Sequence, residues 1–273
     1  MNRETQFILK GAEYSYPQAS EKILKGIDLE IRAGEWVALL GSNGSGKSTL
    51  LKLLSALLTP TQGLCFIGGV NTAAAQPPRG FAAIVFQNPE DQIVAATVEE
   101  EVAFGPENLG CPREEIISRV QNSLRAAGLE TGGEKLVSSL SGGQKQRLAL
   151  AGALAMRPSA LLLDEAMSML DPQSRLDFTR VITEEHSKGL TIIQVTHRLE
   201  EIRGATRVLT LENGVISCDM PAAEFLGKSE KELAEMKLAK PPLEKVAEAL
   251  IKEGLLPPRC GADIEKMSEI LCR

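Results

Sequence analysis

One stretch of this sequence places glycines, a lysine and hydroxyl groups at the spacing of a phosphate-binding loop. Residues 41–48, called the phosphate loop below, match G-x-x-x-x-G-K-[ST] with Gly41, Ser42, Asn43, Gly44, Ser45, Gly46, Lys47 and Ser48, and Thr49 follows. Glycines allow backbone N–H groups to converge on phosphate oxygens, and a helix that begins behind the loop adds positive potential. We expect Lys47 to reach the β- and γ-phosphates of a nucleotide and Ser48 to ligate Mg²⁺.

The elements around this loop fit that chemistry. A buried apolar run, Trp36–Leu40, leads into the loop, and a helical pattern at Leu50–Leu58 leads out of it. A strand, a glycine loop and a helix in this order form the setting in which the motif binds phosphate. This context disfavours the alternative, a glycine-rich turn with an incidental lysine.

A second segment also offers a hydroxyl and backbone donors to an anion. It consists of Ser141, Gly142, Gly143 and Gln144, and a helical pattern at Lys145–Met156 follows. A serine and two glycines at a helix start leave N–H groups without partners in the helix. From the residues alone, a capped helix start that binds no ligand is the favoured interpretation.

The rest of the chain must supply the strands and helices that hold these loops. Short apolar runs alternate with helical patterns, which predicts an α/β fold with a largely parallel sheet. These runs are Trp36–Leu40, Ala82–Phe86, Ala160–Leu163 and Thr191–Val195. Alternation in Phe7–Tyr16 and Ile27–Ile31 predicts an antiparallel β-flap beside that sheet.

The chain divides into a large domain, residues 1–220, and a C-terminal helical module, residues 221–273. Within the first, residues from about 88 to 155 are mostly helical in pattern and predict an inserted subdomain. In the second, Ser229 and Glu232 have the spacing of a capping box. An apolar stripe from Leu243 to Ile251 is expected to pack either on its own module or on a partner.

Composition excludes several classes of protein. The 273 residues are 43% hydrophobic and 24% charged, as in globular proteins, and the net charge is −6. No dense Lys/Arg block occurs, so we expect no nucleic acid partner. The five cysteines are scattered without a C-x-x-C pair, which argues against a disulfide framework or zinc site and fits a reducing cytosol. Neither an export signal nor an apolar run of membrane-spanning length is present, so a membrane role would need a partner.

These motifs, in this order, resemble the ATP-binding-cassette (ABC) ATPase family from about Phe7 to Asp219. The resemblance implies a P-loop NTPase (RecA-like) core with ATP and Mg²⁺ as ligands. The segment from Ser141 to Gln144 is similar to the family's signature motif. Leu161–Glu165 is similar to Walker B, which implies that Asp164 holds the Mg²⁺ hydration shell and Glu165 polarises the attacking water.

Three further residues match by resemblance. Gln87 is similar to the Q-loop glutamine, which contacts Mg²⁺ and water and senses the membrane partner. His197 is similar to the histidine that contacts the γ-phosphate and positions the glutamate and water. Tyr16 resembles the aromatic residue that stacks on adenine, with Tyr14 as the rival. The segment after Glu165 has Ala-Met where the family usually has Pro-Thr.

The family also implies a partner chain. In a head-to-tail dimer, the phosphate loop of one subunit and the signature segment of the other close on one ATP. Hydrolysis then removes the γ-phosphate between the subunits and loosens the dimer. A homodimer and a heterodimer both satisfy this arrangement.

Two stretches indicate a branch of the family. Phe86–Gln92 and Thr97–Asn108 resemble the ATPases of energy-coupling factor (ECF) transporters, which import vitamins and transition-metal ions. The resemblance implies a transmembrane coupling subunit, a membrane substrate-binding component and a location at the cytoplasmic face of the membrane. Acidic residues flank Gln87 and suit a groove for basic coupling helices, although a solvated helix face has the same pattern; they are Glu90, Asp91, Glu99, Glu100 and Glu101. The alternative is the ATPase of a conventional binding-protein-dependent ABC importer.

Overall fold

Two sheets organise the chain in the computed structural model, which describes residues 4–17, 21–129, 135–236, 238–257 and 264–272. The larger sheet has six strands in the order β10-β9-β3-β8-β7-β6, and the smaller has four in the order β2-β1-β4-β5. No helix in these described ranges is long and apolar enough to cross a membrane.

The six-stranded sheet is parallel except for one edge strand. Its parallel strands are β3 (Trp36–Leu40), β6 (Ala82–Val85), β7 (Ala160–Asp164), β8 (Thr191–Val195) and β9 (Arg207–Glu212), and β10 (Val215–Pro221) is antiparallel to β9. Every residue of β3 and β8 is buried, because helices or the second sheet cover both faces. The four apolar runs predicted as strands are therefore confirmed, as is the α/β fold.

The four-stranded sheet is antiparallel and forms the predicted flap. It comprises β1 (Thr5–Tyr14), β2 (Leu24–Arg32), β4 (Gln62–Ile67) and β5 (Val70–Asn71). Burial along β2 largely alternates, as expected for strands with one face on the core. β1 pairs with β2 from Thr5↔Arg32 to Tyr14↔Leu24.

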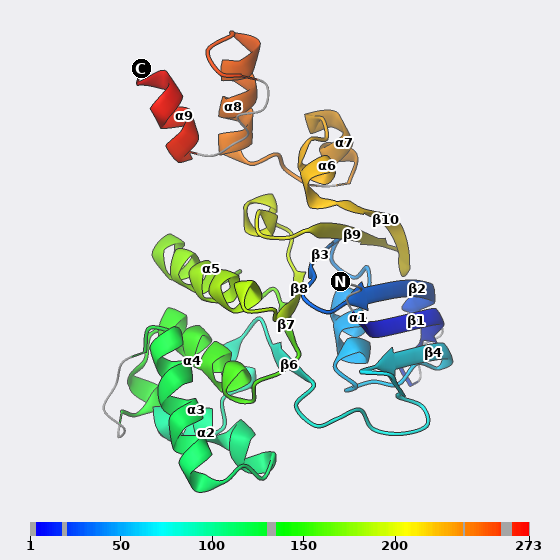
Figure 1. Cartoon of the computed structure of the whole chain (residues 1–273). Helices are drawn as coiled ribbons and strands as arrows, with labels where there is room; N and C mark the ends of the chain where they lie inside the picture. Colours follow the sequence, from blue (N-terminus) through cyan, green and yellow to red (C-terminus); the bar gives the residue numbers. More distant parts are fainter. Residues whose placement is uncertain (1–3, 18–20, 130–134, 237, 258–263, 273) are drawn as a thin grey trace.

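Helix α1 (Lys47–Leu54) follows the phosphate loop and packs between the two sheets (Figure 1). Its four leucines, at 50, 51, 53 and 54, are all 0% exposed. They share one core cluster with Phe7 and Leu9 of the flap and with Leu209 and Leu211 of β9. The predicted extension to Leu58 is wrong: Ser55 caps the helix and Ala56 has φ 59°, a left-handed conformation that ends it.

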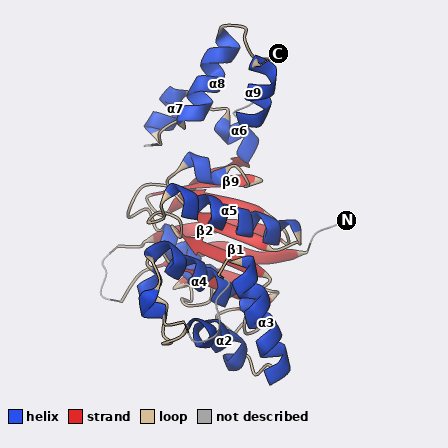
Figure 2. Cartoon of the chain, turned by 90° about the vertical axis from the view of Figure 1, so that its left-hand side faces the viewer, coloured by secondary structure: helices blue, strands red, loops and turns tan. Residues whose placement is uncertain are grey.

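Helices α4 (Gly142–Ala155) and α5 (Pro172–Ser187) cover the opposite face of the six-stranded sheet, as Figure 2 shows. Leu150 of α4 and Phe178 of α5 share a core cluster with Trp36, Leu161 and Leu163 of the strands. The alternation of side chains along each strand thus separates a face that packs on α1 from a face that packs on α4 and α5.

Helices α2 (Val98–Asn108) and α3 (Arg113–Ala126) pack with α4 around a core cluster of their own, which includes Val102, Leu124 and Leu148. They lie within the stretch predicted as an inserted subdomain. Short 3₁₀ turns, η1 (Pro89–Asp91) and η2 (Val137–Ser139), precede α2 and α4 in the chain.

The C-terminal helices are α6 (Ala222–Leu226), α7 (Glu230–Glu235), α8 (Pro242–Lys252) and α9 (Ile264–Leu271), and Figure 1 shows α8 and α9 at the end of the molecule away from α2 and α3. The capping box of Ser229 and Glu232 is confirmed. The apolar stripe packs on its own module, because Leu243, Leu250 and Ile251 contact a cluster that contains Leu256 and Met267. Val246 departs from this pattern and is 50% exposed.

Candidate functional site

The phosphate loop turns sharply at the carboxyl end of β3, and its glycines make that turn possible. Gly41 and Gly46 have φ values of 148° and 106°, in the region that side chains disfavour. A Cβ atom at Gly41 would lie 2.3 Å from the carbonyl oxygen of Leu211, and one at Gly46 would lie 2.9 Å from Leu24 Cδ2. The loop backbone therefore packs against β9 at Gly41 and against the flap at Gly46, and neither position has space for a side chain.

Lys47 curls back over the loop that precedes it. Its Nζ donates hydrogen bonds to the carbonyl oxygens of Gly41 at 2.9 Å and Ser42 at 3.0 Å. Burial lowers the pKa of Lys47, and the nearby carboxylates of Glu165 and Asp164 partly oppose that shift. Ser45 Oγ is buried without a hydrogen-bond partner among the described residues, which leaves a hydroxyl free for a phosphate oxygen.

Ser48 and Asp164 meet although they come from distant parts of the chain. Ser48 Oγ donates to Asp164 Oδ1 at 3.0 Å. Burial raises the pKa of Asp164, the Ser48 hydroxyl lowers it, and neighbouring Glu165 raises it. Hydroxyl and carboxylate oxygens are the ligands that Mg²⁺ prefers, so this donor set fits the predicted metal.

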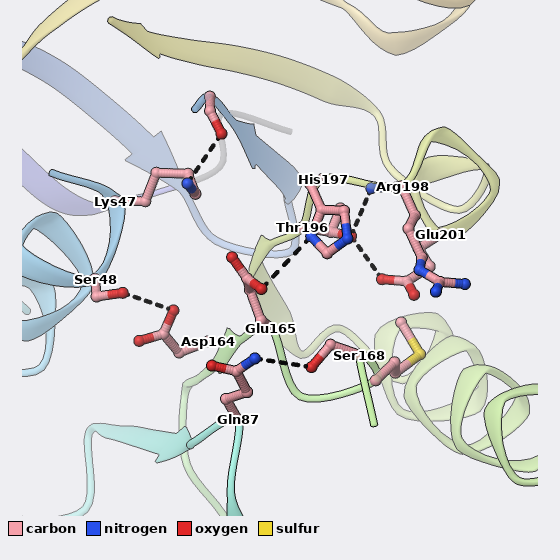
Figure 3. A network of polar contacts seen from close by, with 12 residues as sticks. Lys47, Ser48, Gln87, Asp164, Glu165, Ser168, Thr196, His197, Arg198 and Glu201 are labelled. Atoms are coloured by element: carbon pink, nitrogen blue, oxygen red, sulfur yellow. Dashed lines mark hydrogen bonds and ion pairs between the residues drawn. The ribbon is translucent and has the colours of Figure 1, made fainter. Parts of the chain in front are cut away.

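Figure 3 shows Glu165 and His197 pointing toward each other beside that pair. His197 Nδ1 lies 3.5 Å from Glu165 Oε2, and the side chains are 51% and 18% exposed. Glu165 has φ 49°, an uncommon conformation for a residue with a side chain, and its N–H donates to Val195 O at 3.1 Å. Strained backbone of this kind is concentrated at functional sites.

Gln87 follows β6 and faces the segment after Glu165. Its Nε2 donates to Ser168 Oγ at 3.2 Å, which is a contact with that segment and not with the phosphate loop. Gln92 holds the residues just before Gln87: it accepts from Phe86 N at 3.2 Å and donates to Ile84 O at 3.1 Å.

Tyr16 lies next to the phosphate loop, with its hydroxyl 3.3 Å from Thr49 Oγ1. It is 37% exposed, whereas Tyr14 is 7% exposed and packs edge-on against it at 5.0 Å between ring centroids. Only the Tyr16 ring of this pair offers much surface for stacking, so the structure favours Tyr16 over its rival.

The second predicted phosphate-binding segment is not beside the first. Ser141 caps α4: its Oγ accepts from Gln144 N at 3.3 Å, and Gln144 Oε1 accepts from Ser141 N at 3.0 Å. The hydroxyl accepts in this cap, so its own proton stays available to an anion, as do backbone donors of Gly142 and Gly143 in the first turn. Helices α4 and α1 cover opposite faces of the sheet, and the described hydrogen bonds of Ser141, Gln144 and the Lys145 side chain reach one another or Glu90, not the phosphate loop.

Sequence reasoning missed a buried polar cluster behind His197. Thr196 and Glu201 are 2% and 6% exposed, and Thr196 Oγ1 donates to Glu201 Oε2 at 2.7 Å. Glu201 lies in the 3₁₀ turn η3 (Leu199–Ile202), next to exposed Glu200. Two adjacent glutamates in a polar stretch carry no signal that one of them is buried.

Comparison with known proteins places these features in a family. The sequence model of the ABC transporter family matches residues 24–168. The chain is 40% identical over 277 residues to energy-coupling factor transporter ATP-binding protein EcfA1 of Symbiobacterium thermophilum, covering 97% of this chain and 96% of that protein. It is 41% identical over 268 residues to energy-coupling factor transporter ATP-binding protein EcfA of Syntrophomonas wolfei, with 97% and 98% covered.

Solved structures agree with this grouping. cbiO1 from Clostridium perfringens, part of the ABC transporter complex cbiONQ, has a TM-score of 0.76 and 31% identity over 92% of this chain and 98% of that chain. The dimeric bacterial ABC transporter cassette MJ0796 has a TM-score of 0.72 and 28% identity over 79% of this chain and 98% of that chain. With a family match that includes the phosphate loop, Asp164 and Glu165, and with relatives similar over nearly their whole length, this ATPase belongs to the ABC transporter family, among the ATP-binding proteins of energy-coupling factor transporters.

Proposed function

We propose that this ATPase powers a membrane importer of the ECF type by closing around ATP as a head-to-tail dimer and opening after hydrolysis. In this proposal residues 1–220 are the nucleotide-binding domain and residues 221–273 a helical module. The observation that carries the proposal is that Ser141 and Gln144 bond to each other, with no hydrogen bond to the phosphate loop among the described residues, at the start of a helix that packs on the other face of the sheet from α1. In the proposed dimer each ATP lies between the phosphate loop of one chain and the Ser141–Gln144 segment of the other, oppositely oriented chain.

In this proposal each residue of the site has one role in ATP hydrolysis. Lys47 and the backbone of residues 41–48 hold the phosphates, with Tyr16 against the base. Ser48 and Asp164 hold Mg²⁺, with Gln87 nearby, and the ion neutralises charge on the phosphate oxygens when bound. Glu165 orients the attacking water and accepts its proton, while His197 fixes the carboxylate.

A groove beside Gln87 is the proposed docking site for a membrane subunit. It has a volume of about 410 Å³, and its lining includes Glu90, Ile93, Ala96, Val137 and Lys145. Leu136 in its lining is 54% exposed, and Val94, between the lining residues Ile93 and Ala95, is 66% exposed. Exposed apolar surface with acidic residues at its edge suits a basic amphipathic segment.

The acidic run around this groove is smaller than the sequence indicates. Glu101 is 8% exposed and accepts hydrogen bonds from Val94 N at 2.9 Å and Ala95 N at 2.8 Å. Its carboxylate therefore stabilises the turn before α2. Glu100 completes the capping box with Thr97 at the start of α2. Of the other acidic residues, Glu90 pairs with Lys145, and Asp91 and Glu99 are exposed and can face a partner.

The names of the relatives favour the ECF type over a conventional binding-protein-dependent importer. From the resemblance of Phe86–Gln92 and Thr97–Asn108 to this branch, we propose vitamins or transition-metal ions as the class of cargo. The proposed partners are a second ATPase subunit, a transmembrane coupling subunit and a membrane substrate-binding component, which place the chain at the cytoplasmic face of the membrane.

Purification of the tagged full-length chain from its native membrane tests this proposal. We expect an integral membrane coupling subunit and a small membrane protein to copurify, and ATP hydrolysis per chain to rise with protein concentration as dimers form. Recovery of a binding-protein-dependent permease instead, or a rate independent of concentration in a verified monomer, would contradict the importer type and the dimer respectively.

A further inference from the structure

A buried carboxylate behind His197 contacts Thr196, which precedes the histidine, and Arg175 of α5. Glu201 Oε2 accepts the hydrogen bond from Thr196 Oγ1 at 2.7 Å, and Glu201 Oε1 lies 3.5 Å from Arg175 Nε. Burial raises the pKa of Glu201, while the Thr196 hydroxyl and the charge of Arg175 lower it. A carboxylate buried to this extent needs such partners, because desolvation of an unpaired charge is costly.

The Thr196 side of this cluster fixes the backbone around His197. Thr196 Oγ1 donates to Glu201 and accepts from Arg198 N at 3.1 Å, so residues on both sides of the histidine are bonded to the cluster (Figure 3). Thr196 N also donates to Leu39 O in β3 at 3.2 Å. The imidazole is half-exposed, so its position depends on this backbone more than on packing around the ring.

The Arg175 side fixes the chain after Glu165. Arg175 lies in the first turns of α5, and its guanidinium donates to Leu170 O at 2.9 Å and Met167 O at 3.4 Å. Both carbonyls belong to the segment that connects Glu165 to α5. Because Glu165 has a left-handed backbone conformation, the direction of its side chain depends on how this segment is held.

We infer that Glu201 and Arg175 are positioning residues that set the geometry of the Glu165–His197 pair by joining the two loops. This inference rests on the proposed roles of Glu165 and His197. Among the described contacts, both residues act through these neighbours, because Glu201 bonds to Thr196 and pairs with Arg175, and Arg175 bonds to backbone carbonyls. Misplacement of a catalytic group by a fraction of an ångström to one ångström is enough to slow a reaction substantially.

Glu201→Gln is the primary test, made in the full-length chain within the complex in which it is purified. The amide oxygen can still accept from Thr196, but the charge that faces Arg175 is lost. We expect kcat to fall about tenfold or more while KM for ATP stays within about twofold, because Lys47, Ser48 and Asp164 are unchanged. Glu200→Gln, at the exposed neighbouring position, is the matched control and should leave both constants at wild-type values.

A combined variant distinguishes positioning from general support of the fold. If Glu201 acts through the Glu165–His197 pair, adding Glu201→Gln to a chain that carries both Glu165→Gln and His197→Ala should change kcat by less than about twofold. Independent losses that multiply would overturn the inference, as would a normal kcat in Glu201→Gln alone.

A second pair of variants decides the question if Glu201→Gln folds poorly. Thr196→Ser keeps the hydroxyl and should retain wild-type kcat, whereas Thr196→Val should lower kcat at unchanged KM; equal rates for both would overturn the inference. Wild-type turnover in Glu165→Gln and His197→Ala would instead show that the proposed function of the site is wrong. These outcomes therefore distinguish failure of the positioning inference from failure of the proposed function.

Discussion

Glu165 Oε2 and His197 Nδ1 lie 3.5 Å apart because their strands are adjacent and in register. β7 pairs with β8 in parallel, and Asp164 is opposite Val195 at the carboxyl ends of both strands. The next residues on each strand therefore turn away from the sheet at the same edge, where parallel α/β sheets present their functional groups. The contact between carboxylate and imidazole follows from this register.

Glu165→Gln should separate nucleotide binding from hydrolysis. The amide keeps the size of the side chain but cannot accept a proton from water, and loss of one general base lowers rates by about 10²–10⁴-fold. Lys47, Ser48 and Asp164 remain, so ATP affinity should change little. Single-turnover hydrolysis and nucleotide titration measure the two properties, and Glu184→Gln, at an exposed position of α5, is the control. Normal turnover would remove Glu165 from its proposed role.

The same variant should accumulate as an ATP-bound dimer, which Ser141→Arg should abolish. A bulky cation at the start of α4 would fill the space where the partner's γ-phosphate must approach the backbone donors of Gly142 and Gly143. Size-exclusion chromatography with light scattering, in saturating Mg-ATP, reports the dimer. Ser118→Arg places the same charge at an exposed serine of α3 and should leave the dimer intact. A Glu165→Gln chain that stays monomeric would contradict the two-site dimer.

Charge reversal at Glu90 and Asp91 should uncouple hydrolysis from transport. Both residues are exposed in η1, and Glu90 pairs with Lys145 at 2.6 Å at the edge of the groove. The variants Glu90→Lys and Asp91→Lys would repel a basic partner segment, and we expect transport to fall about tenfold or more. Nucleotide affinity should stay at the wild-type value. Uptake into vesicles, with Glu253→Lys as the control for a distant exposed charge, decides this, and unchanged uptake would refute the docking groove.

Cys65 should resist alkylation while the protein is folded. It is 0% exposed, and burial raises the pKa of its thiol to about 11, so at pH 9 only about one molecule in a hundred carries the reactive thiolate. Cys272 is exposed and should react with iodoacetamide at that pH. Because the pKa is raised, reactivity of Cys65 should rise only as pH approaches 11 or the chain unfolds. Peptide mapping by mass spectrometry, with and without urea, measures both sites; equal labelling in the folded state would show that the thiol is accessible.

Features that depend on the order of strands, loops and helices along the chain could be predicted from the sequence alone. The continuous apolar runs of β3 and β8 predict strands that are buried on both faces. In the sheet β8 lies between β3 and β7, and the carboxyl ends of these parallel strands bring Asp164 of β7 near the phosphate loop. The glycines of the loop are explained by close contact with Leu211 and Leu24, which only the folded chain reveals.

Features that depend on three-dimensional packing could not be predicted. Glu101 belongs to a run of three glutamates, and its burial depends on two backbone N–H groups of the turn before α2. Likewise, the charged partner of buried Glu201 is Arg175, which belongs to α5, an earlier part of the chain. Helix α1 ends early through the backbone conformation of Ala56, for which the residue type gives no signal.

The close approach of Gly41 to Leu211 has a consequence for synthesis on the ribosome. A Cβ at Gly41 would be 2.3 Å from the Leu211 carbonyl, so the phosphate loop takes its shape against β9, a strand translated long after the loop itself. A nascent chain that has emerged only as far as β8 lacks this support, and α1 lacks Leu209 and Leu211 from its core. A ligand stabilises only the state that binds it. ATP would therefore stabilise the phosphate loop only after nearly the whole cassette has been translated.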